Sequence, residues 1–282
     1  MSTPELPRSR AAVESSGAVL DVRESTGSTN ADLLQAASGL PHGSVVATLD
    51  QTAGRGRLDR SWTAPTGQTL AASVLVRADL DDRDRGWLPL VAGAAMRDAV
   101  RAALEPAPDD VTDGTDASRA SRPDGTERVL VKWPNDVLVD GRKVCGILCQ
   151  VADDGAVVVG AGVNLTIPAD ALPTPNATSL VAAGATGDAA GLADAVLSGF
   201  VTGVREAVVA LTTGGADADA VRSHVRSVCG TIGARVRLEL PDGSVVEADA
   251  TGIDDDGRIT IRDRDGVSRG VAVGDVTHLR YA

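Results

Sequence analysis

Three arginines and two glycines lie close together in one short stretch of this chain, Gly54-Arg55-Gly56-Arg57 followed by Arg60. Glycine lets backbone N–H groups approach a ligand closely, and arginine offers paired donors that grip phosphate or carboxylate oxygens. The stretch therefore favours an anion-binding loop. The alternatives are a solvated surface loop and a Gly-Arg tract that contacts RNA, although tracts of that kind are normally longer and repetitive.

A second group of chemically useful residues surrounds a predicted turn. The run from Lys132 to Asp136 reads Lys-Trp-Pro-Asn-Asp, and Lys143 follows shortly after it. Pro134 interrupts a strand and should hold Asn135 and Asp136 in a turn, where their oxygens could face a cofactor or a hydrated Mg²⁺. Lys143 begins the next predicted strand, within reach of a ligand on the sheet. Taken alone, the pattern is explained as well by ordinary turn chemistry and a solvated lysine.

A glycine-containing run at residues 160–165 reads Gly-Ala-Gly-Val-Asn-Leu and follows a valine-rich strand. It lacks the third glycine and the following strand–helix unit of a dinucleotide-binding fingerprint. No Gly-Lys-Ser/Thr run of a P-loop occurs either. A nucleotide site in this chain must therefore be of another kind, and Asn164 is a weak candidate contact by itself.

Composition limits the classes of protein to consider. The chain has 282 residues with 43% hydrophobic and 2% aromatic residues, which allows a large aliphatic core in one large domain, or in one large and one small domain. The net charge of −12 disfavours non-specific binding to nucleic acid and requires a local cationic patch for any anionic substrate. The arginine-containing loop supplies such a patch.

The cysteine count and the absence of long apolar runs predict a cytoplasmic protein. Three cysteines (Cys145, Cys149 and Cys229) do not form a disulfide framework. No apolar segment of secretory type opens the chain, and no uninterrupted apolar run approaches the length of a membrane span. We therefore expect a soluble chain with no membrane partner.

The elements that must position these residues follow from hydrophobic periodicity. We predict helices at residues 31–38, 87–104 and 191–211, and strands at residues 19–23, 44–50, 68–77, 129–132, 137–139, 144–151 and 156–159. The Asp140-Gly141 pair predicts a hairpin turn between two of these strands. Residues 1–18 are expected to form a disordered arm, and residues 105–128, acidic and nearly free of apolar side chains, a flexible insertion.

The last part of the chain has a different pattern. From about residue 231, short strands alternate with the turn sequences Pro-Asp-Gly, Asp-Asp-Gly and Asp-Gly, which is typical of a small β-barrel. The prediction is a domain over residues 19–228 and a β-module over residues 229–282. The overall class is α+β.

Together, these runs resemble the biotin–protein ligase family. The resemblance covers about residues 19–282, and its motifs stand in the family order at residues 28–30, 50–57 with Trp62, 132–136, 141–148, 160–165, 177–180 and 274–280. It implies a mixed β-sheet backed by helices, of the type related to class II synthetases, with a small C-terminal SH3-like β-barrel. The implied activity is ATP-dependent conversion of biotin to biotinyl-5′-AMP, followed by transfer of biotin to a lysine of a biotin carboxyl carrier protein.

The resemblance also implies roles for individual residues. Ser28, Thr29 and Gln51 would hydrogen-bond the biotin ureido group, and Lys143 would contact the biotin carboxylate and the α-phosphate. The full expected biotin-binding set is Ser28, Thr29, Asn30, Gln51, Arg55, Gly56, Arg57, Lys143 and Gly146. The expected ATP and adenylate set is Arg57, Arg60, Trp62, Lys132, Asn135, Asp136, Asn164 and Arg280. Lys143 and Arg57 are the expected catalytic residues, and Asp136 and Asn164 are the expected Mg²⁺ contacts.

Three other functions compete with this interpretation. Lipoate ligases and octanoyltransferases share the sheet and an equivalent lysine, but as a family they lack the Gly-Arg loop combined with Lys-Trp-Pro-Asn-Asp. A non-catalytic biotin-binding regulator and an RNA-binding protein are the others. Some family members carry an N-terminal DNA-binding domain. Here only about 18 residues precede the first predicted strand and none of them suggests a recognition helix, so we expect the monofunctional type, without nucleic-acid partners. The family commonly forms homodimers, so the resemblance gives a second copy of this chain as a candidate partner.

Overall fold

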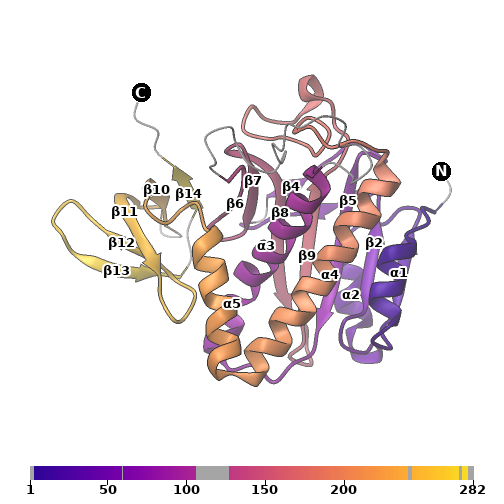
Figure 1. Ribbon diagram of the computed structural model, residues 1–282, viewed down its shortest axis with the longest axis horizontal. Coiled ribbons are helices and arrows are strands. Elements are labelled where there is room, and N and C mark those ends of the chain that lie inside the picture. Colours follow the sequence, from indigo (N-terminus) through magenta and orange to yellow (C-terminus); the bar gives the residue numbers. More distant parts are fainter. Residues whose placement is uncertain (1–2, 59, 106–126, 241–242, 273–274, 279–282) are drawn as a thin grey trace, which may run out of the picture.

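A computed structural model of the chain describes residues 3–58, 60–105, 127–240, 243–272 and 275–278. Most of the acidic insertion, Asp59 and Arg280 lie outside the described residues. The fold consists of a large mixed sheet with helices on both faces and a small antiparallel sheet at the C-terminal end (Figure 1). This confirms the expected α+β class with an SH3-like C-terminal module.

The large sheet has seven strands. In spatial order these are β1 (Leu20–Arg23), β2 (Val45–Thr48), β5 (Thr69–Val76), β9 (Val157–Asn164), β8 (Arg142–Val151), β7 (Asp136–Val139) and β6 (Val129–Lys132). Only β1 and β2 pair in parallel, and the other neighbours are antiparallel. Every residue of the interior strand β5 is buried, because helices or loops cover both faces there.

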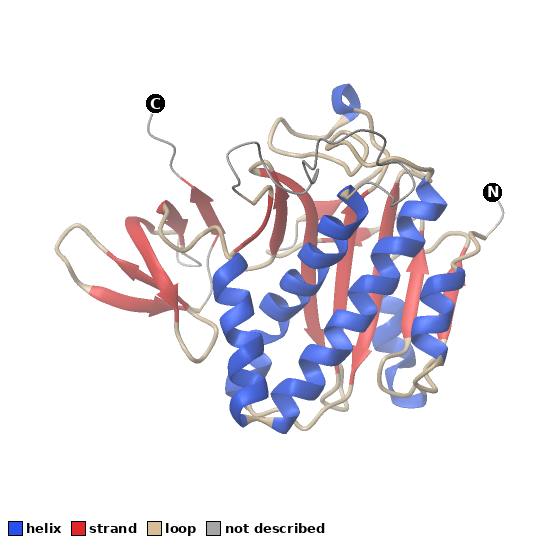
Figure 2. Ribbon diagram, viewed as in Figure 1, coloured by secondary structure: helices blue, strands red, loops and turns tan. Residues whose placement is uncertain are grey.

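The helices are distributed unequally over the two faces of this sheet. α1 (Pro7–Glu14), α3 (Asp82–Leu104) and α4 (Ala189–Thr213) pack on one face, and α5 (Gly215–Val228) packs against α3 and α4 (Figure 2). The short α2 (Thr29–Ala36) contacts the opposite face, over β2, β5, β8 and β9. Within the described residues, 3₁₀ turns lie at Ala37–Gly39 and Ala169–Ala171.

Helix α4 is the one described helix long and apolar enough to cross a membrane. Its apolar side is explained by packing, since Val196, Leu197, Phe200 and Val204 are buried against the core. α4 packs most extensively on α3, where its glycines leave room for alanines of the partner helix. The composition of α4 is thus that of a core helix.

The C-terminal module is a five-stranded antiparallel sheet. Its strands in spatial order are β13 (Ser268–Val271), β12 (Ile259–Arg262), β11 (Val245–Ile253), β10 (Arg235–Glu239) and β14 (Asp275–His278). The turn between β11 and β12 holds the module against the large domain. Trp87 Nε1 donates to the Asp255 carbonyl at 2.8 Å, and Trp133 Nε1 donates to the Gly257 carbonyl at 3.2 Å. Both indole rings are fully buried.

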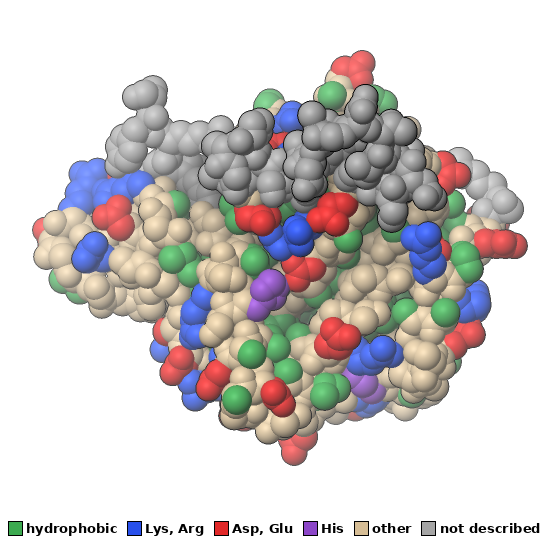
Figure 3. Space-filling model, in the orientation of Figure 1, with side chains coloured by type: hydrophobic (Ala, Val, Ile, Leu, Met, Phe, Trp, Pro, Cys, Tyr) green, Lys and Arg blue, Asp and Glu red, His purple; other side chains and the backbone are tan. Residues whose placement is uncertain are grey.

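The helix-covered face of the molecule carries acidic and basic side chains that are interspersed rather than segregated (Figure 3). Some of them form ion pairs, such as Arg83 in the first turn of α3 with Asp255 at 2.7 Å. Exposed pairs of this kind contribute little to stability individually.

The expectation of a disordered arm at residues 1–18 is wrong for Pro7–Glu14, which form α1. The buried carboxylate of Asp194 on α4 accepts from the backbone N–H of Arg8 at 3.0 Å and of Ser9 at 2.8 Å, and the Ser9 hydroxyl also donates to it. A carboxylate is stabilised at a helix N-terminus because it meets unpaired N–H groups and the positive end of the helix dipole. This cap comes from a residue about 185 positions away, so local sequence gives no sign of it.

Other elements were missed or misplaced at the sequence level. Helix α3 begins at Asp82 rather than at residue 87, because the Asp81 carboxylate caps it by accepting from Asp84 N at 2.8 Å. Helix α5 was not predicted, since Gly215 opens it and its apolar residues are sparse. The glycine-containing run that was expected to follow a strand is itself part of β9.

We predict that Asp194→Ala will release α1 from the domain. The substitution leaves the buried N–H group of Ser9 and the partly buried N–H group of Arg8 without an acceptor, and it should lower the free energy of unfolding by about 1–3 kcal/mol. Chemical denaturation measures the loss, and hydrogen exchange at residues 7–14 locates it. Asp194→Asn, which keeps one acceptor oxygen, should show a smaller effect. Unchanged protection of residues 7–14 in Asp194→Ala would contradict this account of the helix.

Candidate functional site

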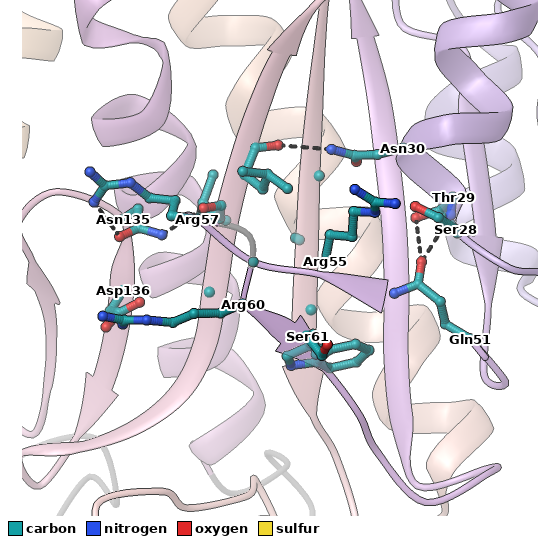
Figure 4. Close-up of a pocket in the computed structure, with 18 of the residues that line it drawn as sticks. Ser28, Thr29, Asn30, Gln51, Arg55, Arg57, Arg60, Ser61, Asn135 and Asp136 are labelled. Atoms are coloured by element: carbon teal, nitrogen blue, oxygen red, sulfur yellow. Dashed lines mark hydrogen bonds between the residues drawn. The ribbon is translucent and has the colours of Figure 1, made fainter. Parts of the chain in front are cut away.

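One wall of a cavity is built where α2 begins above the sheet. Ser28 caps α2, and its hydroxyl accepts from Ala31 N at 3.4 Å. The Thr29 backbone N–H donates to Gln51 Oε1 at 2.9 Å. Backbone pairing between Thr26 and Gln51 holds the two segments together. Ser28, Thr29 and Gln51 therefore present several hydrogen-bonding groups from a fixed frame (Figure 4).

The floor of the cavity is made of glycine backbone. Gly146 on β8 pairs with Gly162 on β9, and Gly160 lies two residues further along the same face. A Cβ atom on Gly162 would lie 2.9 Å from the Trp62 ring, and one on Gly160 would lie 2.0 Å from Asn30 Oδ1. The glycines of residues 160–165 thus allow Trp62 and Asn30 to lie directly on the sheet.

A short hairpin forms the roof. β3 (Gly54–Arg55) pairs with β4 (Ser61–Trp62), and the arginine-containing loop connects them. Arg57 Nη1 donates to Asn135 Oδ1 at 3.2 Å, while Arg55 extends over the sheet nearer to the Ser28–Thr29 wall (Figure 4). Leu58 has a positive φ of 55°, a conformation that is costly for a side chain of its size. The loop therefore contains local strain at the position where it crosses the cavity.

A β-bulge determines where Lys143 points. On β7 and β8, Asp136 pairs with Gly146 and Val137 with Cys145, but Leu138 pairs with Lys143, so that Val144 has no partner opposite. Side chains on a regular strand alternate between faces, and one extra residue reverses the alternation. Lys143 consequently shares the cavity face with Asp136, while Val144 and Cys145 are both buried on the other side.

The ammonium group of Lys143 lies between carboxylate and cavity. Its Nζ is 2.6 Å from Asp136 Oδ1, and Lys132 Nζ approaches the same carboxylate at 3.7 Å. The side chain of Lys143 remains 44% exposed, so an incoming anion can reach it. Behind it, burial raises the pKa of the Cys145 thiol to about 12. Cys145 therefore stays protonated and is unsuited to be a nucleophile or a metal ligand.

The backbone of Lys143 is held by a distant segment. Lys143 N donates to the Asn176 carbonyl at 2.7 Å, and Thr178 N donates to the Lys143 carbonyl at 2.8 Å. Asn164 Nδ2 donates to the Thr178 carbonyl at 2.9 Å. The run at residues 177–180 thus fixes the strand that carries Lys143, a role that its sequence alone did not indicate.

Two neighbouring cavities meet at Lys143. The first, about 200 Å³, contains all nine of the residues expected to bind biotin among its lining residues. The second, about 790 Å³, is lined by Lys132, Asn164 and the Pro173–Ala177 segment among others. The residues shared by both cavities are Arg60, Ser61, Trp62, Asp136, Lys143, Gly146 and Gly162. Two ligands bound side by side would therefore both reach Lys143.

The predicted site residues converge with few exceptions. Arg57 and Asn135 line the first cavity, and Lys132 and Asn164 line only the second of these two. Arg280 lies outside the described residues. Asn30 lines the first cavity, but its amide is hydrogen-bonded within the protein. Sequence reasoning missed Ile147, Leu148, Ala161 and Asn176, because nothing in an aliphatic or amide residue type distinguishes a lining position from a core position.

Two protein-family models and a known relative match this chain. Residues 20–165 match the model of the Biotin/lipoate A/B protein ligase family, and residues 231–279 match the Biotin protein ligase C terminal domain. A biotin–[acetyl-CoA-carboxylase] ligase from Mycobacterium tuberculosis is 39% identical, over 93% of this chain and 89% of that protein.

Solved structures extend the comparison. A biotin protein ligase from Leishmania major in complex with biotinyl-5-AMP has 25% identity and a TM-score of 0.56, over 90% of this chain and 98% of that one. One from Aquifex aeolicus in complex with biotin and ATP shares the fold with a TM-score of 0.67 and 21% identity, over 93% of this chain and 98% of that one.

We predict that Gly162→Val will displace Trp62 from β9 and weaken ligand binding in both cavities, because the new side chain would occupy the space of the ring. Trp87 and Trp133 are fully buried, so a red shift of tryptophan emission reports on Trp62. Gly39→Ala is the matched control, since a Cβ there meets no atom within 4 Å. An unshifted emission spectrum with unchanged ligand affinity would show that close packing on Gly162 is unimportant.

Proposed function

The chain belongs to the biotin protein ligase family, and from that premise we propose that it activates biotin with ATP and transfers the biotinyl group to a lysine of a carboxylase. The biotin carboxyl carrier domain is the acceptor that we propose. The observation that carries the proposal is the position of Lys143 at the junction of two cavities. One cavity has a wall suited to a polar ring, and the other is large enough for a nucleotide.

The smaller cavity suits biotin. Ser28, Thr29 and Gln51 offer hydrogen-bonding groups to the ureido ring at the end away from Lys143. The valeryl chain would run along the glycine floor, below Arg55 and Trp62, and bring its carboxylate to Lys143. Arg57 and Gly56 on the roof would close over the chain. In this arrangement the carboxylate meets the second cavity where the α-phosphate of ATP would lie.

The first step is adenylation. A carboxylate oxygen of biotin attacks the α-phosphorus of ATP, a P–O bond forms, and the bond to pyrophosphate breaks. Negative charge increases on the phosphoryl oxygens and on the leaving pyrophosphate, so the step requires fixed positive groups. We propose that Lys143 and Arg57 stabilise the reacting phosphoryl group, with Arg60, Trp62, Lys132 and Asn135 contacting the nucleotide.

We include Mg²⁺ in the proposal because Asp136 and Asn164 offer oxygen donors that suit this ion. No group of three His, Cys, Asp or Glu side chains gathers in the described part of the chain, so the protein provides no complete metal cage there. Mg²⁺ commonly binds through one or two carboxylates together with substrate phosphates, which fits Asp136 with the amide oxygen of Asn164 beside ATP. When bound, Mg²⁺ would neutralise charge on the leaving pyrophosphate.

The second step is transfer to the acceptor. The neutral ε-amine of the acceptor lysine attacks the carbonyl carbon of biotinyl-5′-AMP, an amide bond forms, and AMP leaves with the electrons of the acyl–phosphate bond while the amine releases a proton. Until the acceptor arrives, the mixed anhydride must be kept from water. The hairpin loop that carries Arg55 and Arg57 is placed to do this.

A lipoate or octanoyl transfer activity is the nearest alternative. The first family match does not distinguish these activities, because its description includes both biotin and lipoate ligases. The match of residues 231–279 to the biotin protein ligase C-terminal domain favours biotin. Incubation of the protein with Mg-ATP and a purified carrier domain should add the mass of one biotinyl group in the presence of biotin and none with lipoate or octanoate. Modification by either of the other acids alone would refute the proposal.

We propose a cytoplasmic location and no nucleic-acid partner. The three cysteines are free thiols, which agrees with a reducing compartment. A salt-dependent change in the gel mobility of plain DNA or RNA on addition of the protein would instead support the regulator or RNA-binding alternatives.

Lys143→Ala should slow adenylation by at least about 100-fold, because it removes a positive group that acts on the developing charge. Pyrophosphate release measures the rate, and biotin binding should be retained in part through the Ser28–Thr29 wall. The neighbouring exposed Arg142 provides the control, since Arg142→Ala should leave the rate near that of the unmodified protein. Near-normal turnover of Lys143→Ala would remove this lysine from the mechanism.

Arg57→Ala should let biotinyl-5′-AMP escape into solvent. The substitution removes the contact between the roof and Asn135, so that the loop closes less firmly over the intermediate. Rapid gel filtration after single-turnover adenylation separates bound from released adenylate. Arg10→Ala, on the distant α1, is the control. Equal retention in Arg57→Ala and the unmodified protein would contradict a closing role for this loop.

A further inference from the structure

A buried polar chain lies behind the wall that we assign to the ureido ring. Ser73 on β5 is fully buried and does not line either cavity at Lys143. Its Oγ is 2.8 Å from Thr29 Oγ1 and 2.6 Å from Asn30 Oδ1. Asn30 Nδ2 in turn lies 2.8 Å from Gln150 Oε1 and 3.2 Å from the Leu148 carbonyl. The chain connects β5 to β8 across the glycine backbone of β9.

The direction of each hydrogen bond in this chain follows from the partners. The Leu148 carbonyl can only accept, so the NH₂ group of Asn30 must face it and the Oδ1 atom must face Ser73. Asn30 Oδ1 can also only accept, so the single hydroxyl proton of Ser73 goes to Asn30. Ser73 Oγ has then no proton left for Thr29, and the contact of 2.8 Å between the two hydroxyls requires that Thr29 donates to Ser73.

This order fixes what the cavity wall presents to a ligand. With its proton committed to Ser73, Thr29 Oγ1 offers lone pairs to the cavity. Gln51 Oε1 already accepts from Thr29 N at 2.9 Å, so Gln51 presents its NH₂ group. The wall therefore places an acceptor beside a donor. An N–H next to a carbonyl oxygen is the complementary pattern, and one edge of a ureido ring has it.

We propose that Ser73 is a positioning residue that orients the Thr29 hydroxyl, so that Thr29 recognises an N–H group of the ureido ring. The inference rests on the proposed function in that biotin is the ligand. Without Ser73, the Thr29 hydroxyl is free to rotate toward Gln51 Oε1, at 3.3 Å, or to point its proton into the cavity at the ligand N–H. In the first case the hydroxyl loses the direction that Ser73 imposes on its lone pairs, and in the second its proton opposes the ligand N–H. Recognition then weakens without the loss of any group that contacts the ligand.

The absence of a side chain at Gly160 is consistent with the same series of buried hydrogen bonds. A Cβ at this position would lie 2.0 Å from Asn30 Oδ1, so any larger residue would push Asn30 away from Ser73. Asn30 is itself buried, and both of its N–H groups and its oxygen have partners in the protein. Asn30 therefore acts by holding Ser73 and Thr29, although it lines the cavity.

The test measures the KM values for biotin and ATP and the kcat of adenylation in Ser73→Ala. We expect the KM for biotin to rise by about five- to tenfold, the effect of one misdirected buried hydrogen bond. The KM for ATP and the kcat at saturating biotin should stay within about twofold, since Lys143 and Arg57 are untouched. Ser44→Ala is the matched control, because Ser44 is equally buried beside the same sheet and its hydroxyl accepts from Val19 N, away from both cavities.

A double-mutant cycle with Thr29→Val separates this role from a general loss of stability. If Ser73 acts through Thr29, its substitution should have little further effect once the Thr29 hydroxyl is absent, so the two changes should be far from additive. Additive effects, or an equal loss in KM for biotin and for ATP, would overturn the proposal. If Ser73→Ala does not fold, Ser73→Cys supplies the same cycle, because a thiol of similar size is only a weak donor and acceptor.

An assay of the unmodified protein distinguishes failure of the Ser73 proposal from failure of the proposed function. Unmodified protein that adenylates biotin establishes the ligand independently of Ser73. If the unmodified protein does not adenylate biotin, the function is wrong and the Ser73 proposal falls with it. If it does, and Ser73→Ala has an unchanged KM for biotin, only the Ser73 proposal is refuted.

Discussion

The site depends on the placement of one positive side chain, that of Lys143, at the junction of two cavities. One residue of β8 that has no partner on β7 produces this placement. Val144 has no partner across the β7–β8 hairpin, and that irregularity turns Lys143 toward the ligand face while keeping Val144 and Cys145 in the core. A regular hairpin with the same sequence would direct Lys143 into the helix layer, where an ammonium group is costly to bury. The contacts of Lys143 with Asp136 on one side and residues 176–178 on the other hold the result in place.

The glycines and the buried hydrogen bonds serve this same face. Gly146, Gly160 and Gly162 bring Lys143, Asn30 and Trp62 close to the strand backbone, which leaves room above them for a ligand. Behind the wall, Ser73 and Asn30 satisfy each other so that the groups of Thr29 and Gln51 facing the cavity have a defined polarity. Burying polar groups costs desolvation free energy, which is offset only when the groups are paired by hydrogen bonds. Here the pairing also defines what the cavity recognises.

The residues of the Lys-Trp-Pro-Asn-Asp run contact two different parts of the molecule. Asn135 meets Arg57 of the roof and Asp136 meets Lys143, whereas Trp133 is buried against the Gly257 turn of the C-terminal module. Arg226 adds a cation–π contact 4.9 Å above the Trp87 ring at the same interface. The small module is therefore anchored a few residues from the cavity, so this one sequence run contributes both to packing and to the cavity lining.

The sequence by itself determined most of the periodic elements and the Asp140-Gly141 hairpin and, through the resemblance, the residues that meet at the cavity. These are local properties, set by residue type and by spacing along the chain. Tertiary structure alone decided the rest. The cap of α1 comes from Asp194 on α4, the orientation of Lys143 comes from strand register, and Ser73 gains its role from α2 lying over β5. Each of these depends on atoms far apart in sequence, and their pairing exists only once the sheet has brought them within hydrogen-bonding distance.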